Sequence, residues 1–159
     1  MKTVKGLHEK MGTFENANTS FHQAARCKRY TNEVLAFSMV KEEELLRATE
    51  EIQNLTYGQG EYKISKVFEP KERLIMALQF RDRVLQWAVY RLLNPLYEKT
   101  YIKDSYACIK ERGREKADAR LQYWLRQPDR KPKQYYYLKL DISKFFYRVG
   151  HEGLLNILK

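Results

Sequence analysis

Residues 62–78, with the sequence YKISKVFEPKERLIMAL, hold two short apolar-rich runs separated by a polar turn. Side chains alternate across a strand, so Tyr62, Ile64 and Phe68 are expected on one face of the first run. Pro70 stands at the second position of the turn, where its ring presets the backbone φ. The stretch therefore predicts a β-hairpin with positive charge at its tip. The expected strands cover residues 62–68 and 73–78.

Helical periodicity surrounds this hairpin on both sides. Apolar residues recur at spacings of three and four from Thr13 to about residue 25, and again over 31–54. The run 41–44 lies either on the wet face of that second stretch or at the start of a new helix after a bend. Downstream, helices are expected over 82–93, with an interruption at Asn94-Pro95, and over 114–127. Two short helical segments finish the chain.

A further strand is predicted over Tyr135–Asp141, within the segment YYLKLDISKFF at 136–146. The strand is expected to be buried and to deliver Asp141 at its carboxyl end. A carboxylate there suits a divalent cation, because Mg²⁺ prefers hard oxygen ligands. The more ordinary interpretation of these residues alone is that Asp141 caps the helix that follows. The predicted fold class is α+β, mostly helical, with one hairpin and this strand.

The composition favours a polyanionic partner. Thirty Lys and Arg residues stand against 20 Asp and Glu, which gives a formal net charge of +10. Such an excess is typical of proteins that bind nucleic acid, although a solubilising surface explains it equally well. No apolar stretch has the length of a membrane span, so no membrane partner is expected. Cys27 and Cys108 are too few for a disulfide scaffold or a zinc site, and a cytoplasmic setting with reduced thiols is expected.

The segment 112–133 is strongly basic, with Tyr123 and Trp124 interleaved among its cations. Guanidinium and ammonium groups neutralise phosphates and release counterions, so contact with an RNA backbone is one interpretation. The other is a solvated helix face that buries Leu121 and Trp124.

Three features, taken in this order, resemble motifs of bacterial reverse transcriptases, the RNA-directed DNA polymerases of group II introns, diversity-generating elements and prophages. The hairpin segment FEPKERLI at 68–75 is similar to the first fingers motif. RDRVLQ at 81–86, continued by NPLYE at 94–98 and DSYAC at 104–108, is similar to the second. The aspartate, the aliphatic residue and the paired aromatics at 141–146 resemble the first palm motif.

The resemblance extends over nearly the whole chain, with one departure. Asn16 and a basic group resemble the amino-terminal extension of bacterial, non-retroviral members; the basic group is Arg26, Lys28 and Arg29. After residue 108 the family usually has an arginine, and a glycine two residues further on, whereas this sequence has Ile109 and Glu111. If the template contact of that arginine is kept, the resemblance implies that Lys110 or Arg112 makes it.

This resemblance implies a division of the chain into two parts. Residues 1–134 are expected to form the extension and the fingers, and residues 135–159 the start of the palm. The rest of the palm and the thumb are not in this sequence. The full-length enzyme is expected to be a nucleotidyltransferase that binds an RNA template, the RNA/DNA hybrid and a dNTP, and that uses two Mg²⁺ ions.

The resemblance also implies roles for particular residues. Asp141 is the first catalytic carboxylate and a metal ligand, and the carbonyl of Ile142 is a further metal ligand. Lys71 and Arg73 contact the triphosphate of the incoming dNTP, from a hairpin that projects over Asp141. Phe146 falls where the family keeps its steric gate against a ribose 2′-hydroxyl. Contacts with the nucleic acid are expected from Lys110, Arg112, Arg114 and Arg120.

The later Tyr-x-Asp-Asp type motif of the family does not occur here, so the chain by itself is not expected to polymerise DNA. Two other classes remain. One is a noncatalytic RNA-binding or maturase-like module, and the other is a helical protein-interaction domain whose motif match is accidental.

Overall fold

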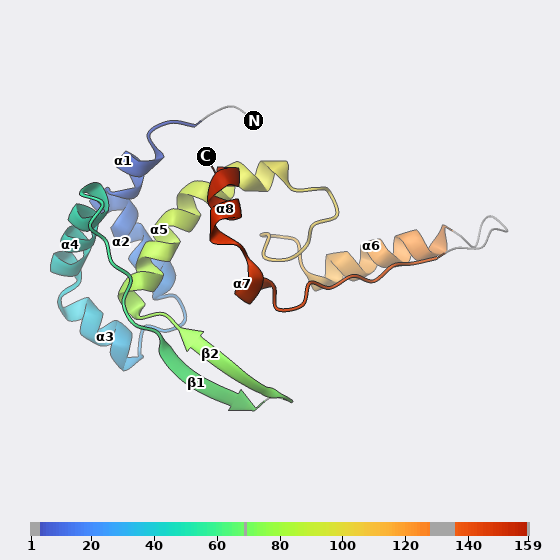
Figure 1. Cartoon of the computed structure of the whole chain (residues 1–159), viewed down its shortest axis with the longest axis horizontal. Helices are drawn as coiled ribbons and strands as arrows, with labels where there is room; N and C mark the ends of the chain where they lie inside the picture. Colours follow the sequence, from blue (N-terminus) through green and yellow to red (C-terminus); the bar gives the residue numbers. More distant parts are fainter. Residues whose placement is uncertain (1–3, 69, 128–135, 159) are drawn as a thin grey trace. The chain divides into compact units, whose positions relative to one another are not determined.

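A computed structural model describes residues 4–68, 70–127 and 136–158 (Figure 1). Contacts divide the chain into two units, Met1–Lys103 and Asp104–Lys159, and each is described by itself. The class is α+β, mostly helical with a two-stranded antiparallel hairpin, which confirms that part of the prediction. The functional boundary predicted after residue 134 stays a prediction, because it falls outside the described residues.

The helices of the first unit precede and follow the hairpin. Their bounds are α1 Leu7–Met11, α2 Phe14–Ala24, α3 Asn32–Met39, α4 Lys41–Gln53, α5 Phe80–Tyr97 and the short 3-10 helix η1 Glu98–Thr100. The Thr13 hydroxyl accepts a hydrogen bond from the Asn16 N–H at 3.3 Å and so caps α2. The long periodic stretch after Thr31 forms two helices with a break at Val40, so the interpretation with a bend is confirmed.

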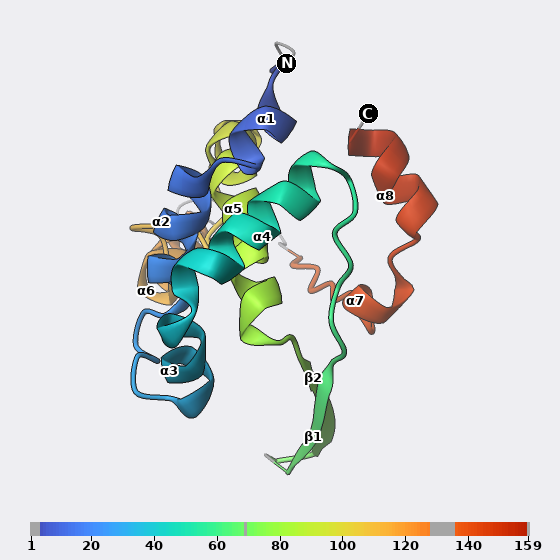
Figure 2. The same cartoon turned by 90° about the vertical axis from the view of Figure 1, so that its left-hand side faces the viewer.

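The core of the first unit lies where α2, α3, α4 and α5 meet (Figure 2). Phe80 is 2% exposed, and Leu45 and Val34 are buried with it. The ring of Phe80 meets those of Phe21 and Phe37 edge to face, with centroids 5.9 and 5.1 Å apart. Edge-to-face geometry suits the quadrupoles of aromatic rings, so these contacts fix the helices as well as burying area.

A buried amide joins α2 to α1 and α5. The side-chain nitrogen of Asn16 donates to the carbonyls of Met11 at 3.4 Å and Ala88 at 3.3 Å. Its side-chain oxygen accepts from the Arg91 guanidinium at 3.0 Å. Each polar atom of this side chain therefore has a partner, as burial of an amide requires.

The hairpin consists of β1 (Lys63–Phe68) and β2 (Glu72–Ala77), in a register that pairs Lys63 with Ala77 and Phe68 with Glu72. This confirms the predicted strands to within a residue at each end. Figures 1 and 2 both show it extending away from the helices of its unit. Its side chains are largely exposed, and Phe68 is 70% exposed. The hairpin therefore adds little to the core.

The interruption predicted at Asn94-Pro95 is wrong, because α5 continues through both residues to Tyr97. A proline inside a helix removes one backbone hydrogen bond and crowds the preceding turn. The packing of α5 against α2 and the Arg91–Asn16 contact one turn earlier offset this loss. Predictions from local sequence do not take such tertiary contacts into account.

The second unit contains α6 (Arg114–Arg126), α7 (Phe145–Arg148) and α8 (His151–Leu158), which confirms the helix predicted over 114–127 and the two short terminal helices. The buried strand predicted over Tyr135–Asp141 is wrong for residues 136–141, which are exposed and have no regular structure. Tyr135 itself lies outside the described residues. A strand needs a partner for its backbone groups, and the one sheet in the described residues contains only β1 and β2.

Two further findings concern the cysteines and the possibility of a membrane span. Cys27 and Cys108 are free and exposed. Among the described helices, none combines the length and the apolar character needed to cross a bilayer. The cytoplasmic setting stays a prediction.

Phe80→Ala is expected to lower the free energy of unfolding by about 3–5 kcal/mol, the usual cost of deleting a buried aromatic ring. Phe68→Ala is the matched control, because the same ring is removed from an exposed position. It is expected to change stability by less than about 0.5 kcal/mol. Urea titrations of both variants measure this difference, and equal losses would contradict the placement of the core.

Candidate nucleic-acid interface

The tip of the hairpin carries the two predicted triphosphate contacts. Lys71 lies in the turn between the strands, and Arg73 lies on β2 opposite Val67. Both are exposed, and neither forms an ion pair with a described residue. Lys66 differs, since its ammonium pairs with Glu72 at 2.8 Å on the opposite face of the hairpin. Lys71 and Arg73 are therefore available to an anion.

The face of the hairpin that carries the Lys66–Glu72 pair also carries exposed apolar side chains. Ile64 and Phe68 of β1 lie beside Leu74 and Met76 of β2 on this face, and all four are exposed. Tyr62, just before β1, is exposed as well. Cations combined with exposed aromatic rings suit a single-stranded nucleic acid, because bases stack on rings while phosphates meet the charges.

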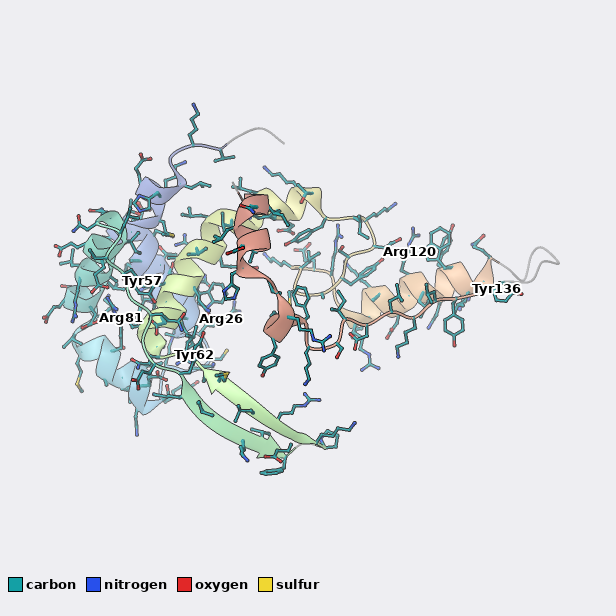
Figure 3. The ribbon with its side chains drawn as sticks, viewed as in Figure 1. Arg26, Tyr57, Tyr62, Arg81, Arg120 and Tyr136 are labelled. Atoms are coloured by element: carbon teal, nitrogen blue, oxygen red, sulfur yellow. The ribbon has the colours of Figure 1, made fainter. Side chains whose placement is uncertain are left out.

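The arginines at the base of the hairpin are paired. The Arg81 guanidinium bonds the carboxylate of Glu51 and lies 3.5 Å from that of Glu44. It also lies over the ring of Tyr57, 5.7 Å from its centroid, and Figure 3 labels both side chains at this place. Arg83 donates to Glu33 at 2.7 Å. These two arginines connect helices and are not free to bind an anion.

Two pKa shifts reflect this arrangement. The hydrogen bond from Arg81 holds the pKa of Glu51 below its usual value, against the opposing effect of burial. Burial, and then the hydrogen bond to Asp82, raise the pKa of the Tyr57 phenol. The phenol therefore stays protonated at neutral pH and acts as a donor to Asp82, at 2.6 Å.

Glu51→Gln tests the ion pair between α4 and α5. A carboxyl with a lowered pKa in the folded state stabilises the fold above its unfolded pKa, and this contribution is lost as the pH falls through the folded pKa. The variant is therefore expected to be about 1 kcal/mol less stable than the native chain at pH 7, and the gap should close at an acidic pH below the folded pKa.

Glu43→Gln is the control for this pH dependence, because Glu43 is exposed on the same helix. Urea titrations at both pH values measure the gap. A difference that stays constant with pH would show that the charge of Glu51 does not contribute.

The residues of the predicted catalytic motif lie in the second unit and are exposed. Asp141 and Ile142 precede α7, and Phe146 lies within it. Phe146 is 89% exposed, and its ring meets that of Phe145 edge to face at 5.3 Å. In the part of the chain that the structure describes, no group of three or more His, Cys, Asp or Glu side chains is placed to hold a metal ion. Asp141 alone does not make a magnesium site.

The predicted nucleic-acid contacts also lie in the second unit, in and before α6. Arg120 donates to Asp104 at 2.9 Å and lies over the rings of Trp124 and Tyr123, 4.7 and 5.1 Å from their centroids (Figure 3). Trp124 is 52% exposed and Leu121 is exposed too, so the interpretation that buries them is wrong. The helix instead presents aromatic rings and cations together.

The other three cations of this group differ in their contacts. Arg112 donates to the carbonyl of Ser105 at 3.0 Å, and Arg114 lies 3.6 Å from Asp118 in an exposed pair. Lys110 is exposed. Lys110 and Arg114 therefore present their charges to solvent, whereas Arg112 and Arg120 also hold the local structure.

The predicted residues divide between the two units. Lys71 and Arg73 share the hairpin of the first unit, and the remaining predicted residues belong to the second. The approach of the hairpin to Asp141 stays a prediction. Sequence reasoning missed Glu33 and Tyr57, which hold the base of the hairpin, because their partners are far away in the chain.

Comparison with known proteins adds no relative from which a role could be transferred. No protein family model matches the sequence, and no curated protein matches it either.

Proposed function

We propose that the chain forms the fingers and the beginning of the palm of an RNA-directed DNA polymerase. The observation that carries the proposal is the exposed hairpin, followed directly by α5, with Lys71 and Arg73 at its tip and in no ion pair with a described residue. Its place agrees with the order of the fingers motifs that the sequence resembles. In this proposal the chain binds an RNA template, the RNA/DNA hybrid and an incoming dNTP.

Lys71 and Arg73 bind the triphosphate of the dNTP in this proposal. A triphosphate needs several positive donors, and the two residues supply different ones. The guanidinium offers a planar fork that bonds two oxygens at once, and the ammonium acts as a point charge. Their exposure and the lack of carboxylate partners among the described residues support this role.

Asp141 and the carbonyl of Ile142 are proposed as ligands of Mg²⁺, and Phe146 as the gate against ribonucleotides. The described residues do not complete a metal site, so further carboxylates from a later part of the palm belong to the proposal. Bound Mg²⁺ supplies charge stabilisation in such polymerases. The exposure of Tyr136, Leu138 and Leu140 supports the proposal, since further palm strands would cover them.

The exposed aromatic and basic side chains of α6 support contact with RNA. The chain is therefore expected to bind a single-stranded RNA with an affinity that falls as the salt concentration rises. Replacing Lys110 and Arg114 together by Ala is expected to lower the slope of log K against log salt by about 1–1.5, because each phosphate contact contributes roughly 0.7.

Replacing Lys10 and Lys28 together by Ala is the control for this titration, because it removes the same net charge from the first unit. Fluorescence anisotropy in rising salt measures all three proteins. Binding that does not depend on salt, or no binding, would favour a protein-interaction domain instead.

The catalytic assignment is tested in the protein encoded by the complete reading frame that contains these residues. Asp141→Asn is expected to abolish incorporation of dNTPs on a primed RNA template while RNA affinity stays within about twofold of the native value. Lys139→Gln is the control, two residues away and exposed. Substantial incorporation by Asp141→Asn would remove Asp141 from catalysis, and no incorporation by the unaltered protein would favour a noncatalytic RNA-binding module.

A further inference from the structure

The hairpin lacks the apolar contacts that would fix its orientation. The residues of β1 and β2 are almost all exposed, and none belongs to the core of the unit. A two-stranded hairpin is at best marginally stable by itself in water. Its position relative to the helices must therefore come from contacts at its base, where the chain enters β1 and leaves β2.

Glu33 on α3 holds the two ends of the hairpin against the helices. One oxygen of its carboxylate accepts the backbone N–H of Phe80, the first residue of α5, at 2.7 Å. The same oxygen lies 3.4 Å from the ammonium of Lys63, the first residue of β1. The other oxygen accepts from Arg83 at 2.7 Å. A single side chain thus joins the start of β1 to the helix that follows β2.

Asp82 on α5 holds the segment that leads into β1. Its side chain is 3% exposed, and its two oxygens accept from the Tyr57 hydroxyl at 2.6 Å and from the Gly60 N–H at 3.1 Å. A Cβ at position 60 would lie 3.1 Å from a carboxylate oxygen of Asp82, so only glycine permits this approach without a shift. A buried carboxylate needs such donors, because an unpaired charge there is very costly.

We propose that Glu33 and Asp82 are positioning residues, which set the orientation of the hairpin and thereby of Lys71 and Arg73 at its tip. This inference rests on the proposed function for its consequence in catalysis. The effect on the orientation of the hairpin does not rest on that function. Loss of either carboxylate frees the base of the hairpin while the helical core stays intact. The two residues bond different parts of the base, so each contributes separately.

The first experiment measures amide hydrogen exchange in the 159-residue chain. Glu33→Gln and Asp82→Asn keep the side-chain shape and remove the charge. Each is expected to speed exchange of the amides of residues 63–77 by about tenfold, with unchanged exchange in α2. Glu43→Gln is the matched control and should change neither. Tyr57→Phe serves where Asp82→Asn fails to fold, since it removes one donor and leaves the carboxylate in place.

The second experiment uses the protein of the complete reading frame and dTTP as the probe. Glu33→Gln is expected to raise KM for dTTP by about fivefold with kcat within about twofold, because the chemical step is not altered. A purely structural loss would lower kcat through a smaller active fraction and leave KM unchanged.

The outcomes separate the two proposals. Unchanged exchange at residues 63–77 in both variants would overturn the positioning role, whatever the kinetics. Faster exchange with an unchanged KM would overturn its link to nucleotide binding. Faster exchange in a protein whose unaltered form does not incorporate dNTPs would support the positioning role and contradict the polymerase.

Discussion

The first turn of α5, Phe80–Arg83, is the junction on which the rest of the first unit depends. The ring of Phe80 lies in the core, while the flanking arginines pair with carboxylates of α3 and α4. Asp82 points instead to the segment before β1. One helical turn thus connects two helices, the core and both ends of the hairpin. Apolar burial supplies the stability of this unit, and the polar contacts determine its geometry.

Because polar contacts and not apolar burial hold the hairpin, its side chains are accessible to a ligand. A hairpin that is exposed on both faces keeps its side chains available to a ligand, which a packed hairpin could not do. Its orientation then depends on charge-assisted hydrogen bonds, which are directional and require a particular geometry. The second unit shows a similar arrangement on a smaller scale, where Arg120 bonds Asp104 and lies over two exposed rings. In both places, cations and aromatic side chains are held near one another at the surface.

Local sequence pattern predicts the elements that depend on neighbouring residues. It does not predict the elements whose form depends on contacts between residues far apart in the chain. Alternation over residues 62–78 gave the hairpin, and the spacing of apolar residues gave most helices. The break predicted at Asn94-Pro95 does not occur, because the contacts that continue α5 are tertiary. Residues 136–141 were expected to form a strand from their alternation, yet a strand also needs a partner. The roles of Glu33 and Tyr57 could not be predicted, because their partners lie dozens of residues away.

The central proposal is that the exposed rings of the hairpin and those of α6, each in its own unit, contact RNA. Photo-crosslinking with an RNA that contains 4-thiouridine, followed by mass spectrometry of the crosslinked peptides, tests it most directly. Crosslinks are expected at exposed rings in both elements. In the hairpin these are Tyr62, just before β1, and Phe68 within it; in α6 they are Tyr123 and Trp124. Crosslinks confined to α1–α4, under conditions in which the RNA is bound, would contradict it.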